Sequence, residues 1–325
     1  MSHYLPLVAA LITMLVTTLL VYGKNISQTT QHDAQRDLEP PSTPRSGGIA
    51  LLAGILAAWV LVFKELSWWV VLPLLAVFVV SLMDDRRGVP LRTRLLVQSG
   101  ASLLLLFGSG VMMQYPLLAA VLLFIVVWMT NLYNFMDGAD GLAGGMAFFG
   151  FTAYGVAALI GSQPTFAMLN FSVAAAALGF LYYNYSPAKI FLGDSGSMVL
   201  GFLVSAMGVA GWQLGLWSLW FPLLVFFPFI ADSSVTQVIR KLHGKKITVP
   251  HREHFYQRLL DMGWSHKQLA VAAYVLMIGV AITGMIALHQ SSSWVVTTFL
   301  AWIAIYAGLM FLIHRRWQTF QGEMP

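Results

Sequence analysis

Long apolar stretches recur along almost the whole chain and constrain its fold more than any other feature. Of the 325 residues, 58% are hydrophobic and 10% are charged, whereas soluble domains carry about 25% charged residues. A water-soluble fold of this length cannot hide so much apolar surface, so the excess must face lipid. We therefore expect an all-α, polytopic membrane protein.

The apolar stretches predict where the helices cross the membrane. A bilayer core about 30 Å thick is crossed by roughly 17–25 apolar residues. The first stretch lacks a basic leader and is too long for a signal-peptide core, so we interpret it as a spanning helix. We expect about eleven spans in one membrane domain over residues 1–325. The predicted spans cover residues 4–22, 47–64, 68–83, 94–109, 116–133, 142–160, 166–184, 196–213, 216–236, 268–288 and 293–313.

The basic residues are distributed unevenly between alternate connections and predict the orientation. One set of connections holds only Lys64, whereas the other set and the C-terminal tail hold the other 17 of 18 Lys and Arg residues. By the positive-inside rule that side is cytoplasmic, with the N-terminus outside and the C-terminus inside. Of the 13 acidic residues, only Glu65 lies on the other side. This asymmetry indicates that the protein acts on a substrate from the cytoplasm. Long loops that simply carry more charge would produce the same asymmetry. The predicted cytoplasmic segments are 23–46, 84–93, 134–141, 185–195 and 237–267.

The overall charge and the cysteine count exclude some classes of function. The net charge of +5 reflects membrane topology, so we do not interpret it as nucleic-acid binding. Cysteine is absent, which excludes disulfides and thiol chemistry.

Two adjacent carboxylates, Asp84 and Asp85, end the third predicted span. Neighbouring residues on a helix point about 100° apart, so the two acids can serve different partners. A helix end that simply meets water, with Arg86 and Arg87 as counter-charges, is the alternative interpretation.

Amide and acid side chains recur every three residues at the end of the predicted span 116–133 and after it. Such groups at membrane depth are costly and are functional by default. The glycines that follow allow the chain to bend the later acids back toward one site. A purely structural turn would need only one or two of these side chains. The residues are Asn131, Asn134, Asp137 and Asp140, with Gly138 and Gly141.

Asp194 stands among small residues in the segment from Phe191 to Ser197. The small residues let a bulky ligand approach the backbone, and Ser195 and Ser197 are candidates to cap the next helix. A helix N-terminus also favours phosphate. An ordinary capping aspartate is the alternative. Another acid, Asp232, lies near the inner end of the ninth span, where it can pair with a neighbouring helix instead of touching substrate.

A polar segment after the ninth span carries His251, Arg252, Glu253 and His254. If this turn is helical, the two histidines share one face of a short interfacial helix that Gly263 ends. Zinc needs more nitrogen or sulfur ligands than the sequence offers here, so a cation held by carboxylates and phosphates would be magnesium. We interpret the histidines and arginines as phosphate or sugar contacts; a basic surface helix on anionic lipid is the alternative.

Further along, Ser265 and Gln268 predict a capping box that opens the tenth span. Before the second span, the stretch from Pro40 to Gly48 is either a plain Pro/Gly linker or places Arg45 beside an anion.

Taken together, these motifs resemble the polyprenyl-phosphate N-acetylhexosamine-1-phosphate transferases of glycosyltransferase family 4, which include the MraY and WecA enzymes. The resemblance extends from about Thr43 to about Arg258 and consists of five motifs in the expected order. The motifs are Thr43 to Gly48, Asp84 with Asp85, Asn131 to Gly145, Phe191 to Ser197, and His251 to His254.

The resemblance implies an activity, its partners and its location. Enzymes of this family transfer a sugar phosphate from a UDP-sugar to undecaprenyl phosphate and release UMP, with magnesium. For this chain it implies a UDP-N-acetylhexosamine donor, an undecaprenyl phosphate acceptor, Mg²⁺ (with Mn²⁺ as the alternative) and no nucleic-acid partner. It implies a multi-pass protein of the bacterial inner membrane with its site facing the cytoplasm, and it is compatible with a homodimer.

Site roles also follow from the resemblance. Asp84, Asp85 and Asp194 are the implied catalytic residues, with the first two near the lipid phosphate and Asp194 as principal magnesium ligand, assisted by Asp85. Phe191 would stack on uracil, and the histidines would hold the diphosphate or sugar. The predicted substrate-binding residues are Arg45, Asn131, Asn134, Asp137, Asp140, Phe191, His251, Arg252 and His254.

The chain departs from the family pattern at one motif. The phospho-MurNAc-pentapeptide enzymes carry a triple-histidine cluster where this chain has His251, Arg252, Glu253 and His254. The chain therefore looks more like the branch that starts O-antigen or other surface polysaccharides. The peptidoglycan enzyme is the alternative in the same class. A secondary transporter is the alternative in another class, because transporters also contain intramembrane acids and broken helices.

Overall fold

The computed structural model describes residues 2–23, 43–246, 249 and 251–323, so most of the predicted segment 23–46 lies outside the described residues. Over these ranges the chain forms helices and loops, without strands. In chain order the elements are η1 (Ser2–Tyr4), α1 (Leu5–Tyr22), α2 (Gly47–Val60), η2 (Phe63–Glu65), α3 (Trp68–Arg87), α4 (Leu91–Gly108), α5 (Val111–Gln114), α6 (Pro116–Phe135), α7 (Leu142–Ile160), α8 (Pro164–Asn184), α9 (Asp194–Gln213), α10 (Trp220–Val225), α11 (Phe227–Leu242), α12 (Phe255–Asp261), α13 (His266–Ala287) and α14 (Ser292–Glu323).

Within the described ranges, eight helices are long and apolar enough to cross a membrane, and α2 is a shorter apolar helix. The eight are α1, α3, α6, α7, α8, α9, α13 and α14. The predicted class, an all-α polytopic membrane protein, is therefore confirmed. The count of eleven spans and the orientation remain predictions.

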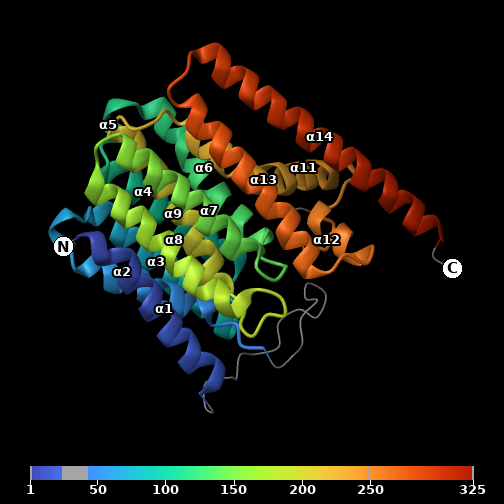
Figure 1. Cartoon of the computed structure of the whole chain (residues 1–325), viewed down its shortest axis with the longest axis horizontal. Helices are drawn as coiled ribbons and strands as arrows, with labels where there is room; N and C mark the ends of the chain where they lie inside the picture. The colour runs from blue at the N-terminus through green and yellow to red at the C-terminus, as the bar shows by residue number, and fades with distance from the viewer. Residues whose placement is uncertain (1, 24–42, 247–248, 250, 324–325) are drawn as a thin grey trace.

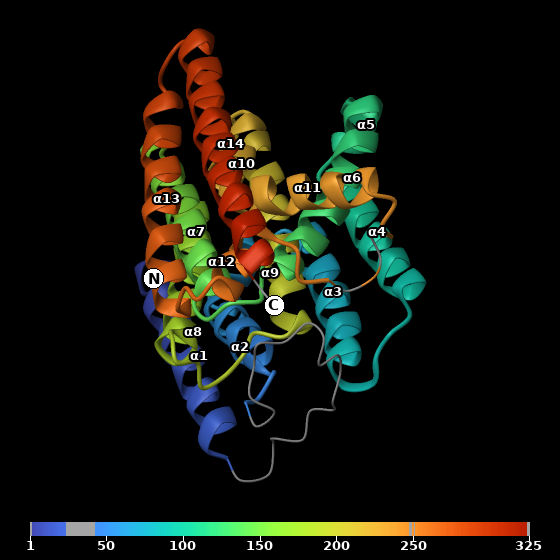
Figure 2. The ribbon, with the colours of Figure 1, turned by 90° about the vertical axis from the view of Figure 1, so that its right-hand side faces the viewer.

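The predicted span 216–236 is wrong as one continuous helix. The structure divides this region into α10 and α11 at Phe226, and Pro228 lies in the first turn of α11. Proline has no backbone N–H and its ring hinders the preceding turn, so a helix ends before it and a new one begins. Figure 2 shows α11 lying across the other helices rather than alongside them.

The helices α3, α4, α6, α7, α8 and α9 run alternately in opposite directions, so their ends alternate between the two ends of the bundle (Figure 1). The ends of α3, α6 and α8 therefore lie together with the starts of α4, α7 and α9. We call this the site end of the bundle. The short helix α12 and the end of α14 lie there too (Figure 2).

α9 is the central helix of the bundle, because nearly all of its residues are buried. It contacts α2, α3 and α6. Small residues allow these close approaches: a Cβ atom on Gly48 of α2 would clash with the backbone of Gly196 of α9. Small residues at such crossings let helix backbones approach closely in membranes, where lipid itself is as apolar as the packed side chains.

The stretch just before α2 is held against the loop that precedes α9. Gly47 N donates to Phe191 O at 2.9 Å, Gly48 N donates to Leu192 O at 2.8 Å, and Phe191 N donates to Pro44 O at 2.8 Å. These backbone hydrogen bonds bring two segments far apart in the sequence to the same place at the site end. Arg45 is therefore fixed beside the start of α9.

Two of the local helix predictions have different outcomes. The capping box is confirmed, because Ser265 and Gln268 cap the start of α13 reciprocally. The helical turn through the histidines is wrong, because α12 begins only at Phe255 and His254 is its N-cap residue. The His254 N–H is satisfied by Gln257 Oε1 at 3.2 Å.

Candidate active site

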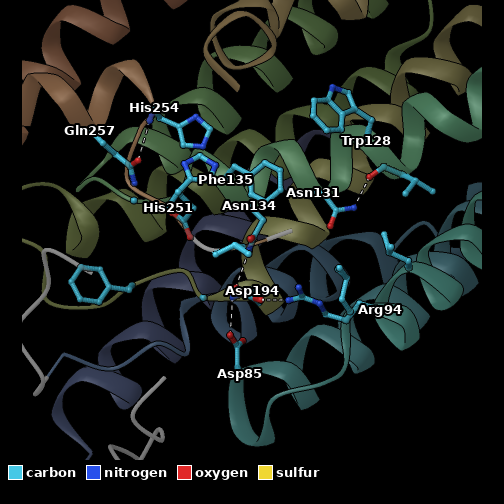
Figure 3. Close-up of a pocket in the computed structure, with 18 of the residues that line it drawn as sticks. Asp85, Arg94, Trp128, Asn131, Asn134, Phe135, Asp194, His251, His254 and Gln257 are labelled. Atoms are coloured by element: carbon cyan, nitrogen blue, oxygen red, sulfur yellow. Dashed lines mark hydrogen bonds and ion pairs between the residues drawn. The ribbon is translucent and has the colours of Figure 1, made fainter. Parts of the chain in front are cut away.

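A cavity of about 360 Å³ opens at the site end, between α3, α4, α6, the start of α9 and the segment before α12 (Figure 3). Its polar lining residues are Arg45, Asp85, Arg94, Asn131, Asn134, Asp137, Asp194, His251, His254, Tyr256 and Gln257. Its apolar wall includes Phe124, Trp128, Phe135 and Phe191. Charged, amide and aromatic side chains therefore all line the cavity.

Most of the predicted site residues converge on this cavity. Those that line it are Arg45, Asp85, Asn131, Asn134, Asp137, Phe191, Asp194, His251 and His254. The other three, Asp84, Asp140 and Arg252, are absent from its lining. The chemical roles of all twelve remain predictions.

Asp85 holds the start of α9. Its Oδ1 accepts the backbone N–H of Asp194 at 2.8 Å, and its Oδ2 accepts that of Ser195 at 2.9 Å. A carboxylate at a helix N-terminus satisfies backbone donors that have no partner within the helix and meets the positive end of the helix dipole. Asp85 therefore caps α9, and the predicted capping by Ser195 or Ser197 is wrong, because both residues lie inside α9 and its N-cap residue is Gly193.

Gly193 makes this capping arrangement accessible. Its φ of +72° is one that other residues adopt only with strain, and a Cβ atom there would lie 3.1 Å from both carboxylate oxygens of Asp85. The glycine thus lets the chain turn tightly into α9 while the α3 carboxylate approaches its backbone.

Asp194 is oriented by side chains from two other helices. Asn134 Nδ2 donates to Oδ1 of Asp194 at 2.8 Å, and Arg94 donates to Oδ2 at 3.2 Å (Figure 3). Asn134 Nδ2 also donates to the Ser197 hydroxyl at 2.9 Å. The Asp194 carboxylate is therefore fixed at the cavity wall, where α4, α6 and α9 meet.

Arg94 is a site residue that the sequence analysis counted only as a topological charge. It forms an ion pair with Asp84 as well as with Asp194. Asp84 in addition accepts the backbone N–H of Val89 at 2.6 Å. Asp84 is thus connected to the cavity through its ion pair with Arg94. A basic residue placed in the first turn of the helix after the acidic pair was the signal that could have identified it.

Gln98 is a second residue that the sequence analysis missed. It is buried in α4, and its Oε1 accepts a hydrogen bond from Asn131 Nδ2 at 2.6 Å. Asn131 Nδ2 also donates to Val127 O at 2.8 Å. These two hydrogen bonds from Nδ2 fix the side chain of Asn131 in the cavity wall. A glutamine inside an apolar helix was the available signal.

His251 and His254 lie side by side just before the N-terminus of α12, with ring centroids 4.9 Å apart (Figure 3). Nδ1 of His254 lies 3.2 Å from Oδ1 of the buried Asp232 of α11. The expectation that Asp232 pairs with a neighbouring element is thus confirmed. His251 Nε2 lies 3.2 Å from Gln237 Nε2, so both histidines are oriented from α11.

The segment that carries these histidines is attached to the end of α11 by charges. Glu253 Oε1 accepts hydrogen bonds from Arg240 at 2.6 Å and from Lys245 at 2.9 Å. Partial burial raises the pKa of the Glu253 carboxyl, but Lys245 and Arg240 outweigh this and hold the pKa below its ordinary value.

Asp140 and Arg252 have partners away from the cavity. Oδ2 of Asp140 accepts the backbone N–H of Ala188 at 3.1 Å, and its Oδ1 lies 3.3 Å from Nδ1 of His266. Arg252 donates to Asp261 Oδ1 at 2.8 Å. These contacts connect the loops of the site end to one another.

The donor set at Asp194 fits magnesium in one particular mode. The described residues contain no group of three or more His, Cys, Asp or Glu side chains that would hold an ion alone. Magnesium, however, is usually held by one or two carboxylates together with waters and substrate phosphates. The 26% exposed Asp194 side chain offers such a carboxylate at the cavity wall. The oxygens of Asp85 accept backbone N–H groups at the start of α9, whereas those of Asp194 accept donors from the side chains of Asn134 and Arg94. A metal ion at Asp194 would therefore displace side chains and not the helix backbone, so Asp194 is the better placed of the two.

Comparisons with known proteins agree with the sequence resemblance. The family model "Glycosyl transferase family 4" matches residues 67–211, which include α3, α4, α6 and the start of α9. The chain is 26% identical to the probable undecaprenyl-phosphate N-acetylglucosaminyl 1-phosphate transferase of Bacillus subtilis, over 96% of this chain and 93% of the relative.

Two further relatives carry different names. The decaprenyl-phosphate N-acetylglucosaminephosphotransferase of Mycobacterium leprae is 29% identical, over 86% of this chain and 81% of its own length. The phospho-N-acetylmuramoyl-pentapeptide-transferase of Staphylococcus saprophyticus is 26% identical, over 89% and 98%. The similarity thus covers the cavity and most of the bundle.

Proposed function

The chain belongs to glycosyl transferase family 4, and from this premise we propose that it transfers an N-acetylhexosamine 1-phosphate from a UDP-sugar to undecaprenyl phosphate and releases UMP. That it is a membrane-embedded sugar-phosphate transferase follows from the family and the named relatives. The donor, the acceptor and the orientation toward the cytoplasm of a bacterial inner membrane belong to the proposal.

The observation that carries the proposal is the position of Asp194. Its carboxylate lies at the wall of a cavity that is also lined by Arg45 and Arg94. A carboxylate flanked by arginines suits a diphosphate, because the arginines neutralise phosphate charge and the acid can share a divalent cation with phosphate oxygens. The ring of Phe191, which also lines the cavity, offers a surface for the uracil ring.

The reaction exchanges one phosphoanhydride for another. An oxygen of the lipid phosphate forms a bond to the β-phosphorus of the UDP-sugar, and the bond from that phosphorus to the bridging oxygen breaks. The bridging oxygen leaves with UMP, and the sugar remains on the transferred phosphate. Such a step needs mainly positioning and neutralisation of charge. A covalent phosphoryl-aspartate is the alternative route.

The residues of the chain have distinct parts in this scheme. Asp85 fixes the start of α9 and so places Asp194, while Arg94 connects Asp84 to Asp194 and offers positive charge to the phosphates. Magnesium bound at Asp194 would neutralise charge on the diphosphate of the donor and on the leaving UMP. His251 and His254 would contact the sugar or the diphosphate from the opposite wall.

Within the family we favour the branch that starts O-antigen or other surface polysaccharides. The supporting observation is the His251-Arg252-Glu253-His254 segment in place of a triple-histidine cluster. The peptidoglycan enzyme remains the second candidate, because relatives with that name match most of the chain.

The test is UMP release by the detergent-solubilised full chain. We expect UMP only when a UDP-N-acetylhexosamine and undecaprenyl phosphate are both present, and a panel of UDP-sugars identifies the donor. Turnover of UDP-MurNAc-pentapeptide alone would move the chain to the peptidoglycan branch. A transporter would form no UMP in detergent, where no sealed compartment exists.

A separate incubation distinguishes the two routes. The enzyme is mixed with labelled UDP-sugar and no lipid acceptor. Direct attack predicts neither UMP nor labelled protein. Stoichiometric UMP together with labelled protein would establish the phosphoryl-aspartate instead.

A further inference from the structure

We propose that Asp232 is a positioning residue that holds a proton on Nδ1 of His254 and thereby directs Nε2 of His254 into the cavity. The role of His254 in turnover rests on the proposed function, whereas the proton position does not. Asp232 lines a separate, mostly apolar cavity and not this one, so toward the site it would act only through His254.

Four donors converge on the buried Asp232 carboxylate. Its Oδ1 accepts from the Phe255 backbone N–H at 3.0 Å and from the Thr236 hydroxyl at 3.2 Å, and it lies 3.2 Å from His254 Nδ1. Its Oδ2 accepts the Tyr256 backbone N–H at 3.0 Å. The side chain is only 9% exposed, so water does not compete for these contacts.

These partners decide which nitrogen of the imidazole carries the proton. Backbone N–H groups can only donate, and an ionised carboxylate can only accept. Asp232, which already accepts two backbone N–H groups, is therefore an acceptor toward His254 as well. Nδ1 must be the protonated nitrogen, and a neutral His254 then has its lone pair on Nε2.

The plane of the ring is fixed by neighbouring aromatic rings. His254 is stacked with His251 at 4.9 Å and 26°, with Tyr256 at 5.8 Å and 22°, and with Phe135 at 6.2 Å and 29°. The stack and the Nδ1 contact together oppose rotation of the ring. Since His254 lines the cavity and Asp232 does not, the ring edge with Nε2 is the one turned toward a ligand.

The fixed tautomer determines what His254 can recognise. Neutral His254 presents an acceptor at Nε2, which suits a hydroxyl or amide N–H of the sugar nucleotide. A carboxylate behind an imidazole sets its tautomer and orientation in many enzyme sites, and its loss costs about 10- to 100-fold in function where this has been measured in metal sites. We expect a decrease of that size in kcat/KM for Asp232→Asn.

The proton position can be measured without substrate. The full chain is labelled with ¹⁵N-histidine in detergent, and His254 is assigned by the signal that His254→Gln removes. We expect the Nδ1–H tautomer in the wild-type chain and a mixture or the Nε2–H form in Asp232→Leu, which removes both carboxylate oxygens. An Nε2–H tautomer in the wild type, or an unchanged spectrum in a folded Asp232→Leu variant, would overturn the proposal.

Kinetics then separate positioning from mere folding. If Asp232 acts through His254, the double variant Asp232→Asn with His254→Gln should be no slower than His254→Gln alone. Losses that multiply would contradict this. Thr236→Val is the matched control, because it removes one hydrogen bond to Asp232 and leaves the histidine contact, so it should keep the tautomer and the rate. Melting temperatures of all variants identify any that fail to fold.

A chain with the expected tautomer but no UMP release would leave the proton assignment standing and refute the proposed function. The reverse result, UMP release with the wrong tautomer, would refute only the assignment. The two outcomes are therefore distinguishable.

Discussion

The carboxylate of Asp85, in the last turn of α3, accepts the backbone N–H of Asp194, the first residue of α9, at 2.8 Å. Two acids separated by more than a hundred residues thus meet end to end, one through its side chain and the other through its backbone. In this arrangement the side chain of Asp194 lines the cavity. Asp85 has a structural role as a helix cap, in addition to any catalytic role.

Replacing Asp85 with asparagine should destabilise the site end. The amide nitrogen of asparagine would face a backbone N–H of Asp194 or Ser195, so one cap hydrogen bond becomes a contact between two donors. We expect a loss of about 1–2 kcal/mol, the usual value of a helix N-cap. Thermal unfolding in detergent measures it against Glu65→Gln, an exposed acid outside the site. Equal melting temperatures for the two variants would contradict the capping role.

Replacing Asp194 with asparagine should abolish turnover. Asparagine keeps the shape and can still contact Asn134, but it loses the charge that suits a metal ion. We expect UMP release to fall by more than about 100-fold while the melting temperature changes little. Near-normal turnover would remove Asp194 from the metal assignment.

Removal of divalent metal should stop the wild-type enzyme. We expect EDTA to abolish UMP release and excess Mg²⁺ to restore it, with Mn²⁺ as a weaker or equal substitute. The reason is that the described residues hold no carboxylate cluster that would retain an ion without the substrate's phosphates. Activity that persists in EDTA would refute the magnesium proposal.

Replacing Arg94 with alanine should weaken catalysis more than replacing its neighbour Arg92. Arg94 contacts both Asp84 and Asp194, whereas Arg92 is exposed. Hydrogen bonds between charged groups contribute about 1.5–3 kcal/mol, so kcat/KM should fall roughly 10- to 100-fold in Arg94→Ala. Arg92→Ala serves as the matched loss of charge. Similar kcat/KM values for the two variants would show that the contacts of Arg94 with Asp84 and Asp194 do not contribute to catalysis.

The Glu253 contacts should make stability depend on pH in the acid range. The folded-state pKa of Glu253 lies below its ordinary value of 4.5, so its contribution is present above that value and is lost as the pH falls through the folded pKa. We expect Glu253→Gln to have a lower melting temperature than the wild type at neutral pH. The difference in melting temperature between the two should become smaller below about pH 4. Melting curves across this range measure it. A difference that is independent of pH would show that Glu253 contributes by packing instead.

The sequence determined the class of this protein and most of its helices, because these depend on local properties. A run of apolar residues long enough for the bilayer predicts a helix wherever it occurs, and a Ser265–Gln268 pair predicts a helix start from four residues alone. The sequence also placed Asp85, Asn134 and Asp194 in one site, because polar groups at the ends of apolar helices are costly and need a reason.

Only the tertiary structure decided how these residues are used. Three contacts between different elements show this: Asp85 caps α9, Arg94 joins Asp84 to Asp194, and Asp232 contacts His254. Local pattern carries no information on such distances, because they depend on which helix faces which. The break at Phe226 is different, because Pro228 marks it in the sequence and the long apolar run concealed that signal. How α11 lies across the bundle was decided by packing alone.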